Sequence, residues 1–291
     1  MRVAVIGANG QVGNDLVRAF AENRDEVFAL THSEVEITST ESVRGCLEEV
    51  QPDVVVNSAA MHNVERCEQE PGQAYAANGL GARNLALVTR DLGVVLMHIS
   101  TDYVFDGTKD EPYTEEDRAL PLNVYGNTKL AGEYFIRSLN RKHFILRTAA
   151  LYGKYPCRAK GGLNFVDLML KLAREGRRVR VVKNEIVSPT STAELACQVV
   201  ALASCDVYGV YHATGEGCCS WYDFASEIFT VTDTRVDLQV ALPNEFLAKA
   251  PRPKFSALEN RGLKRLGLNR FSPWQNAVRH YLGRSSAAVS T

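Results

Sequence analysis

Near its start the chain reads Val3-Ala4-Val5-Ile6-Gly7-Ala8-Asn9-Gly10-Gln11-Val12-Gly13. The first four residues form an apolar, β-rich run, and Leu16, Val17 and Phe20 follow the glycines at helical spacing. The segment therefore predicts a strand, a tight turn and a helix. Glycines in such a turn let the backbone approach a pyrophosphate, which the free N–H groups of the helix N-terminus bind. A Gly-x-x-Gly-x-x-Gly pattern alone can be only a turn, but its position directly after a strand favours dinucleotide binding.

Apolar strand-like runs alternate with helical segments over the first half of the chain. The expected strands and the helical segments between them are, in order, Val27–Leu30, Ser42–Val50, Val54–Asn57, Gly72–Leu92, Val94–Ile99 and Phe144–Arg147. This alternation is typical of an α/β fold with a doubly wound parallel sheet, the Rossmann arrangement. Ligands of such sheets collect at the carboxyl ends of the strands. We therefore expect one edge of the sheet to carry Gly7–Gly13, Ser58-Ala59-Ala60 and Ser100-Thr101.

After the fifth expected strand the alternation loosens into glycine-rich and proline-rich connections. It returns with an expected helix at Thr192–Ala203 and a short strand at Val210–Ala213. We therefore expect two interleaved parts: a nucleotide-binding domain and a smaller C-terminal substrate-binding lobe. The former comprises residues 1–148 with 190–213 returning, and the latter 149–189 and 214–283. The small, polar residues 284–291 are expected to be a flexible tail.

A candidate acid–base pair lies in Tyr125-Gly126-Asn127-Thr128-Lys129, because positions i and i+4 share one face of a helix. Hydride transfer to a ketone carbon leaves an alkoxide, which must be held by a hydrogen bond and protonated. Tyr125 would donate the proton, and Lys129 would lower the pKa of the phenol from its ordinary value of about 10. Thr101, at a strand end, would hold the oxygen. The alternative is an exposed aromatic-lysine pair on an amphipathic helix. The N-terminal glycine pattern favours the catalytic interpretation over this one.

Composition agrees with a globular enzyme, since 291 residues, 45% of them hydrophobic, can bury a large core. Lys and Arg number 33 against 34 Asp and Glu, and this net charge of -1 supplies no general attraction for nucleic acid or an anionic membrane. The basic cluster between Arg174 and Lys183 is most simply a solvated helix end, with contact to a phosphorylated substrate as the alternative. Seven cysteines without metal-ligand spacing, and no apolar run of membrane-spanning length, predict reduced thiols, no metal site and a cytoplasmic location.

Several further motifs occur together and in a fixed order. Besides the glycine pattern they are Asn57-Ser58-Ala59-Ala60, Ser100-Thr101-Asp102-Tyr103-Val104-Phe105, Tyr125-Gly126-Asn127-Thr128-Lys129, Arg147-Thr148, Ser188-Pro189-Thr190 and Arg252-Pro253-Lys254-Phe255-Ser256-Ala257-Leu258. With them the chain resembles the extended short-chain dehydrogenases/reductases and, more narrowly, the dTDP-4-dehydrorhamnose reductase family. The resemblance runs from about residue 1 to residue 283.

The resemblance implies an NAD(P)H-dependent reduction of the C4 ketone of a nucleotide-linked 6-deoxysugar, such as dTDP-4-dehydrorhamnose to dTDP-L-rhamnose. It implies that the catalytic residues are Thr101, Tyr125 and Lys129. The cofactor contacts that it implies are Gly7, Gly10, Gln11, Val12, Gly13, Ala59, Ala60 and Lys129. Near the sugar nucleotide it places Val64, Asp102 and Tyr103. Family members are often dimers, so a homodimer is expected by analogy.

Three departures from the family pattern concern the substrate. The family often has a tryptophan in its Arg-Thr-Ser-Trp-Leu-Tyr-Gly segment, whereas Ala150 stands here, so a large aromatic surface is missing. His62 stands where a small hydroxyl residue is frequent; it is a candidate sugar contact, with a surface or packing histidine as the alternative. The insert from Lys154 to Gly162 is longer than usual and could offer charge to a diphosphate through Lys154, Arg158 and Lys160.

Cofactor preference depends on the segment after the second strand. No acid occupies its first positions, and Thr31, His32 and Ser33 could donate to a 2′-phosphate, which favours NADPH over NADH. Glu36-Ile37 resembles the acidic-apolar pair that holds adenine. An ordinary exposed loop is the alternative for all of these residues.

Two other classes of protein fit the same motifs. The regulatory β subunit of methionine adenosyltransferase shares this fold, binds NADP and looks similar around Ser100–Lys129, including the tyrosine and the lysine. Sugar-nucleotide epimerases and dehydratases of the superfamily hold NAD tightly and need no added reductant. Dependence on a larger partner enzyme would identify the first class, and turnover without cofactor consumption would identify the second.

Overall fold

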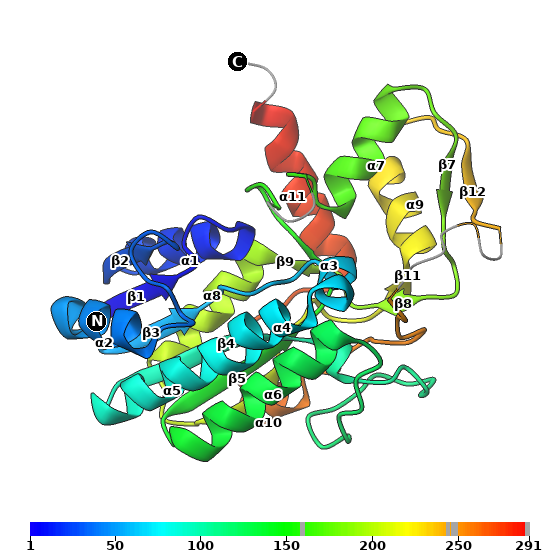
Figure 1. The fold of residues 1–291 in the computed structure, drawn as a ribbon. Helices are drawn as coiled ribbons and strands as arrows, with labels where there is room; N and C mark the ends of the chain where they lie inside the picture. The colour runs from blue at the N-terminus through cyan, green and yellow to red at the C-terminus, as the bar shows by residue number, and fades with distance from the viewer. Residues whose placement is uncertain (158–160, 243–244, 246–249, 289–291) are drawn as a thin grey trace.

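A parallel sheet forms the centre of the molecule in a computed structural model that describes residues 1–157, 161–242, 245 and 250–288 (Figure 1). Six strands are hydrogen-bonded in the order β10-β5-β4-β3-β1-β2. Every neighbouring pair among them runs parallel. In chain order they are β1 (Arg2–Ile6), β2 (Glu26–Leu30), β3 (Val54–Asn57), β4 (Val95–Thr101), β5 (His143–Thr148) and β10 (Gly209–His212).

Helices cover both faces of this sheet, because successive strand residues point to opposite sides. Val3 and Val5 of β1 pack in one core cluster with side chains of α1 and α8. Ala4 and Ile6 pack in a second cluster, on the other face, with side chains of α2, α5 and α6. The doubly wound parallel sheet expected from the sequence is therefore confirmed. The five helices are α1 (Gln11–Glu22), α2 (Thr40–Val50), α5 (Gly81–Asp91), α6 (Val124–Leu139) and α8 (Thr192–Ala203).

The strand order reverses at β1, which lies between β2 and β3. Ligands of such sheets bind outside the carboxyl ends of the strands next to the reversal. The register places Ile6 of β1 beside Asn57 of β3, and Asn57 beside His98 of β4. Strand β4 continues past that row to Thr101, which lies beside Thr148 at the end of β5. This edge carries the turn after β1, the loop after β3 and the end of β4, as the sequence predicted.

The segment predicted as helical over Gly72–Leu92 is not one continuous α-helix. A π-helical turn interrupts it, and this turn contains the buried Asn78. The Asn78 side chain bonds to the backbone N–H and C=O of Met61, at 2.8 and 2.9 Å, and to the Thr128 hydroxyl at 3.0 Å. The wider turn thus coincides with a side chain that joins the loop after β3 to α6. The elements before α5 are α3 (Val64–Gln69), α4 (Pro71–Ala74) and the π-helix η1 (Tyr75–Leu80).

A smaller lobe stands beside the sheet, at the upper right of Figure 1. Its core is aromatic: the rings of Phe165 and Phe224 stack with centroids 5.5 Å apart, and Trp274 meets Phe224 edge-on. Tyr152 is fully buried in the same cluster. The lobe consists of α7 (Phe165–Arg174), α9 (Trp221–Val231), α11 (Trp274–Ala288) and the strand pairs β7 (Val179–Val181) with β12 (Leu238–Val240) and β8 (Ile186–Val187) with β11 (Cys219–Ser220).

The chain crosses between sheet and lobe several times. Strand β6 (Leu151–Tyr152) pairs with β9 (Thr190–Ser191), next to the expected boundaries at 148 and 190. The region 214–283 then returns once more to the sheet through α10 (Arg261–Arg265), because Leu263 and Phe271 belong to the core cluster of α1 and α8. The two-part division remains our proposal, with this additional return.

The C-terminal helix reaches into the segment that was expected to be a tail. Helix α11 extends to Ala288 and so takes in part of the segment 284–291 that was expected to be a flexible tail. Residues 289–291 lie outside the described residues.

Candidate active site

A cavity of about 250 Å³ lies at the carboxyl edge of the sheet, where the lobe meets it. The lobe contributes Val187 and Trp221 to its wall. Among the residues predicted for the site, the cavity brings together Gly10, Gln11, Val12, Gly13, Ala60, His62, Val64, Thr101, Asp102, Tyr103, Tyr125 and Lys129. The candidate catalytic trio therefore shares one cavity with the glycine turn, and the roles of these residues remain predictions.

The turn after β1 packs so tightly that two of its positions admit only glycine. Gly7 has a φ of +79°, and a Cβ on it would lie 2.8 Å from the backbone nitrogen of Ala59. A Cβ on Gly13 would lie 2.1 Å from the carbonyl oxygen of Gly7. Helix α1 starts after Gly10, which has no side chain to cap its first N–H groups. These donors in the cavity wall, together with the helix dipole, fit the pyrophosphate of a dinucleotide.

The candidate catalytic side chains come from two elements that meet at the cavity. Thr101 ends β4, and its hydroxyl accepts a hydrogen bond from the N–H of Tyr103 in the 3₁₀ helix η2 (Asp102–Val104). Tyr125 and Lys129 lie on the first two turns of α6. The i, i+4 spacing therefore places both side chains on the face of α6 that borders the cavity.

Helix α6 approaches η2 closely because position 126 is glycine. A Cβ on Gly126 would lie 2.1 Å from the carbonyl oxygen of Tyr103. Asn123 caps the helix by accepting a hydrogen bond from the Gly126 N–H at 2.8 Å. The approach brings the rings of Tyr103 and Tyr125 edge to face, with centroids 6.0 Å apart.

Tyr125 has a raised pKa, whereas the sequence argument expected Lys129 to lower it. Burial of the phenol is the main cause; hydrogen bonding with Thr101 opposes the shift, and the carboxyl group of Asp102 adds to it. The Nζ of Lys129 is instead bonded to the carbonyl oxygen of Ile99 at 2.7 Å and to Nε2 of His98 at 2.9 Å. Tyr125 is therefore protonated at neutral pH, which is the form that can donate.

Lys129 is 2% exposed, an unusual place for an amine. Burial lowers its pKa to about 8, and Glu133 on the next turn limits the fall. The Glu133 carboxylate is itself held by Arg147, with Nη2 and Oε2 2.7 Å apart, and by the Ser100 hydroxyl at 2.6 Å. A group with this pKa can change its protonation state near neutral pH.

Asp102, predicted as a substrate contact, is also buried in the cavity wall. Burial raises its pKa to about 6, and hydrogen bonds, including one donated by the Thr101 hydroxyl at 3.0 Å, limit the rise. When charged, this carboxyl group accepts hydrogen bonds from hydroxyl groups, and when protonated it can also donate one.

The loop after β2 differs from its sequence-based interpretation. The carboxylate of Glu34 folds back and accepts hydrogen bonds from the N–H and the hydroxyl of Thr31 and from the Ser33 hydroxyl. These bonds lower the pKa of Glu34 to about 2. An acid therefore does stand at the end of β2, and it engages the hydroxyls that were expected to donate to a 2′-phosphate. His32 pairs with Glu36, at 3.2 Å from Nε2 to Oε2.

Ile37 is packed into the sheet rather than open to a ligand. It is buried, and a Cβ on Gly81 would lie 2.9 Å from its Cδ1. Its carbonyl oxygen accepts a hydrogen bond from Asn84 at 3.0 Å. The described cavity wall contains none of Thr31, His32, Glu36 and Ile37, so their contacts to a cofactor remain predictions.

The lobe supplies an aromatic surface near the position where the family tryptophan is missing. Ala150 lines the cavity and has a φ of +44°. Trp221, the first residue of α9, lines the same cavity, and its ring packs against Phe165 with centroids 4.7 Å apart. Sequence reasoning missed Trp221 because only the packing of the lobe on the sheet brings it to the site.

His62 meets a cysteine from the insert that the sequence marked as unusually long. Its Nε2 lies 3.6 Å from Sγ of Cys157, and both residues line the cavity. The backbone of Cys157 pairs with that of Gly162 in both directions, at 3.2 and 3.0 Å. The insert thus brings Cys157 to the cavity wall. Lys154 is exposed, and Arg158 and Lys160 lie outside the described residues.

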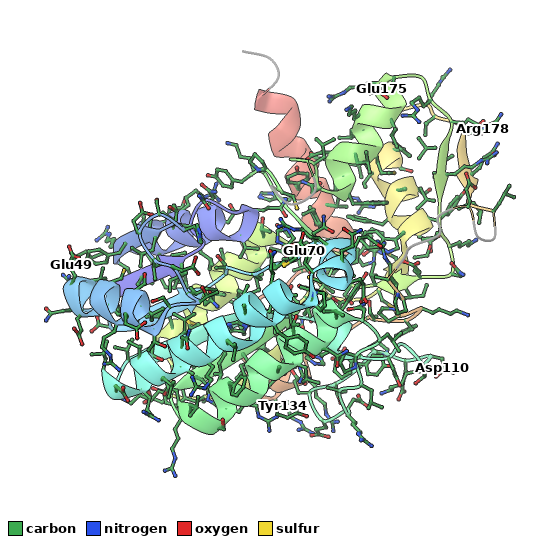
Figure 2. All side chains as sticks on the ribbon, in the orientation of Figure 1. Glu49, Glu70, Asp110, Tyr134, Glu175 and Arg178 are labelled. Carbon is green, nitrogen blue, oxygen red and sulfur yellow. The ribbon has the colours of Figure 1, made fainter. Side chains whose placement is uncertain are left out.

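The basic cluster between residues 174 and 183 contributes nothing to the described cavity wall. Arg178 pairs with Asp237 at 2.6 Å, and Arg180 pairs with Glu245 at 3.0 Å. Figure 2 shows Arg178 and Glu175 at the outer end of the lobe. The pairs are those of a solvated surface, which was the simpler of the two sequence-based interpretations.

Metal sites, disulfides and membrane-spanning helices were also sought in residues 1–157, 161–242 and 250–283. No group of three or more His, Cys, Asp or Glu side chains there is placed to hold a metal ion. All seven cysteines are unpaired. No helix in the part of the chain that the structure describes combines the length and the apolar character that crossing a membrane requires.

Known proteins share this arrangement over almost the whole chain. A spore coat polysaccharide biosynthesis protein of Bacillus subtilis, SpsK, is 41% identical over 287 residues and covers 99% of each sequence. A dTDP-4-dehydrorhamnose reductase structure from Clostridium acetobutylicum is similar with a TM-score of 0.93 at 37% identity, covering 98% of this chain and 100% of that one. Another, from Bacillus anthracis in complex with NADP, has a TM-score of 0.92 at 35% identity, covering 97% and 99%.

The family assignment follows from a family model that matches almost the whole chain. The family model described as RmlD substrate binding domain matches residues 1–287. The resemblance that the ordered motifs indicated is thereby confirmed. This chain belongs to the RmlD substrate-binding-domain family.

Proposed function

We propose that this chain uses NAD(P)H to reduce the C4 ketone of a nucleotide-linked 6-deoxysugar, converting dTDP-4-dehydrorhamnose to dTDP-L-rhamnose or acting on a close analogue. One observation carries the proposal: Thr101, Tyr125 and Lys129 share a cavity with a glycine turn that fits a dinucleotide. The reductase names of the similar structures support the substrate class.

The proposed chemistry divides between the cofactor and three side chains. The nicotinamide, when bound, supplies the hydride to the ketone carbon. As the electron pair of the C=O bond moves to oxygen, Tyr125 donates its proton to that oxygen, so an alcohol forms and a phenolate remains. The Thr101 hydroxyl, whose single O–H is donated to Asp102 in the structure, would turn to donate it to the developing oxyanion. Burial of Tyr125 keeps the proton on the phenol until the alkoxide needs it.

We assign NADPH as the reductant, with NADH as the alternative. The similar reductase from Bacillus anthracis, solved with NADP, supports this assignment. Gly7–Gly13 would hold the pyrophosphate, Ala59 and Ala60 would line the cofactor cleft, and Lys129 would bind the nicotinamide ribose. Glu34 predicts that NADH is also used, because a carboxylate at the end of β2 accepts from a 2′-hydroxyl and repels a 2′-phosphate.

The nucleotide sugar would contact His62, Val64, Asp102 and Tyr103, which lie in the same wall as the trio. A homodimer belongs to the proposal by analogy with the family, and light scattering over a range of protein concentrations tests it. The cytoplasmic location expected from the cysteine content also stays a prediction, which cell fractionation tests.

The test of the function is incubation of the purified protein with dTDP-4-dehydrorhamnose and NADPH. We expect one NADPH to be consumed for each molecule of dTDP-L-rhamnose formed, followed by cofactor absorbance and by NMR of the product. Conversion of the sugar without added reductant would instead indicate an epimerase or dehydratase. Reduction that fails with several dTDP-4-keto-6-deoxysugars, together with co-purification of a larger enzyme, would indicate a regulatory subunit.

A further inference from the structure

Two buried polar side chains that are not part of the cavity wall, Asn57 and His98, form a row of contacts that ends at Lys129. The Nδ2 of Asn57 lies 3.0 Å from Nδ1 of His98, and Nε2 of His98 lies 2.9 Å from Nζ of Lys129. Asn57 and His98 are each 1% exposed and come from the neighbouring strands β3 and β4. Nothing in the proposed chemistry explains why a histidine stands there.

A backbone group two residues further along fixes the orientation of the Asn57 amide. The backbone N–H of Ala59 approaches Oδ1 of Asn57 at 3.0 Å, and an N–H group can only donate. The atom that faces Ala59 must therefore be the amide oxygen. The amide nitrogen is left facing His98, so it donates to Nδ1.

The orientation of the amide decides the tautomer of His98. Complete burial lowers the pKa of His98 well below its ordinary value, so the ring is neutral. A neutral imidazole has one N–H and one acceptor nitrogen. Since Nδ1 accepts from Asn57, the hydrogen is on Nε2, and Nε2 donates toward Lys129.

This tautomer restricts the protonation of Lys129. An ammonium group has three donors and no acceptor, so it would face the Nε2–H of His98 with a second N–H. A neutral amine has a lone pair that accepts from Nε2–H, and it can still donate to the carbonyl oxygen of Ile99 at 2.7 Å. Burial of Lys129 also disfavours the ammonium form, as the tautomer of His98 does.

We propose that Asn57 and His98 are positioning residues that fix Nζ of Lys129 and shift its equilibrium from the ammonium toward the neutral amine, through a single enforced tautomer of His98. The consequence for catalysis rests on the proposed reductase function. A Lys129 that gives up its proton more readily favours the phenolate of Tyr125 less, and so adds to the effect of burial in keeping the transferable proton on the phenol. The tautomer itself does not depend on that function.

Other ionisable groups around the amine have to be separated from this effect. Tyr125 and Glu133 lie on α6 with Lys129, Asp102 lies on η2, and Cys67 of α3 borders Tyr125. The charge of Glu133 is compensated by Arg147 of β5. A useful variant therefore changes the hydrogen bonding of His98 while all of these groups stay in place.

Asn57→Asp is such a variant: it replaces the atom that faces His98 and adds one negative charge, so the tautomer of His98, rather than the titration of Lys129, is the deciding measurement. One carboxylate oxygen still accepts from Ala59, and the other now accepts from Nδ1–H of His98. The tautomer is reversed, Nε2 becomes an acceptor, and the ammonium form of Lys129 is stabilised. The lysine Cε signal of Lys129 should then titrate at least about one pH unit higher than in the wild type.

The experiment is ¹⁵N NMR of histidine-labelled protein without added ligand. The His98 signals are identified by their loss in His98→Gln, and folding is checked by the remaining spectrum. We expect the wild type to carry the hydrogen on Nε2 and Asn57→Asp to carry it on Nδ1. Wild-type protein with hydrogen on Nδ1 overturns the proposal, even if Asn57→Asp fails to fold. The NMR measurement needs no substrate, so its outcome does not depend on the activity assays. A wrong substrate assignment would therefore leave the test of the tautomer intact.

Discussion

The two sides of the cavity are built in different ways. The sheet side, comprising Gly10–Gly13, Thr101, Tyr125 and Lys129, follows from the ends of parallel strands and the starts of the helices behind them. The lobe side comprises Ala150, Cys157, Val187 and Trp221, which come from connections and from a separate packed unit. The sheet side carries the proposed chemistry, and the lobe side carries two of the three departures from the family pattern, Ala150 and the insert that contains Cys157. Reaction type and substrate choice should therefore respond to different substitutions.

Tyr125→Phe should have the largest effect, because it removes the proton donor from the sheet side. We expect turnover to fall by roughly 10² to 10⁴-fold, with little change in cofactor affinity. Steady-state kinetics and fluorescence titration with NADPH measure the two quantities. Tyr134→Phe is the matched control, since Tyr134 lies on the same helix but is 57% exposed and points outward in Figure 2. Near-normal turnover in Tyr125→Phe would exclude the assigned role.

Gly13→Ala should damage cofactor binding through the backbone. The added Cβ would lie 2.1 Å from the Gly7 carbonyl oxygen, so the turn must shift. Strain of about 1 to 3 kcal/mol in the bound state corresponds to a loss of NADPH affinity of about 5- to 150-fold, which calorimetry measures. Gly45→Ala is the control, because a Cβ at this position in α2 meets nothing within 4 Å. It should leave affinity unchanged and stabilise the protein by about 0.5 to 1 kcal/mol. Unchanged affinity in Gly13→Ala would contradict the proposed pyrophosphate site.

Trp221→Ala tests the lobe side in isolation. If its ring contacts the nucleotide sugar, KM for that substrate should rise by about tenfold while cofactor affinity stays the same. Trp221→Phe should recover most of the loss, because it keeps an aromatic face against Phe165. A fall in turnover at unchanged KM would show that the lobe side takes part in the chemistry, and the comparison drawn above would fail.

Glu34→Gln should have the smallest effect and concerns cofactor choice alone. Removing the charge at the end of β2 should raise the ratio of kcat/KM for NADPH to that for NADH by about two- to fivefold, because water and salt screen an exposed carboxylate. Glu49→Gln, on the exposed face labelled in Figure 2, should leave the ratio unchanged. A ratio that falls in Glu34→Gln would mean that Glu34 helps to orient the phosphate donors instead.

Much of the sheet side could be predicted because its determinants are local. The alternation of apolar runs located β3 at Val54–Asn57 and α8 at Thr192–Ala203, the bounds that the structure has. Register then brings the ends of β1, β3 and β4 to one edge without further information. The π-helical turn was missed because its residues suit an α-helix equally well, and only the contacts of Asn78 distinguish it.

The remainder of the site depends on contacts between residues far apart in the chain. Trp221 reaches the cavity only through the packing of the lobe, and Cys157 meets His62 across two loops. The sequence has no acid in the first positions after β2, but a folded-back loop brings the carboxylate of Glu34 to the strand end. His98 looks like an ordinary strand residue until the register sets it between Asn57 and Lys129.

Transfer of deuterium tests the central claim most directly. The protein is supplied with NADPH that carries deuterium at the transferable position and with dTDP-4-dehydrorhamnose, and the product is analysed by NMR. We predict one deuterium at C4 of the sugar for each NADPH oxidised, in the wild type and, much more slowly, in Tyr125→Phe. A product formed without deuterium at C4 would contradict hydride transfer to that carbon and with it the proposed function.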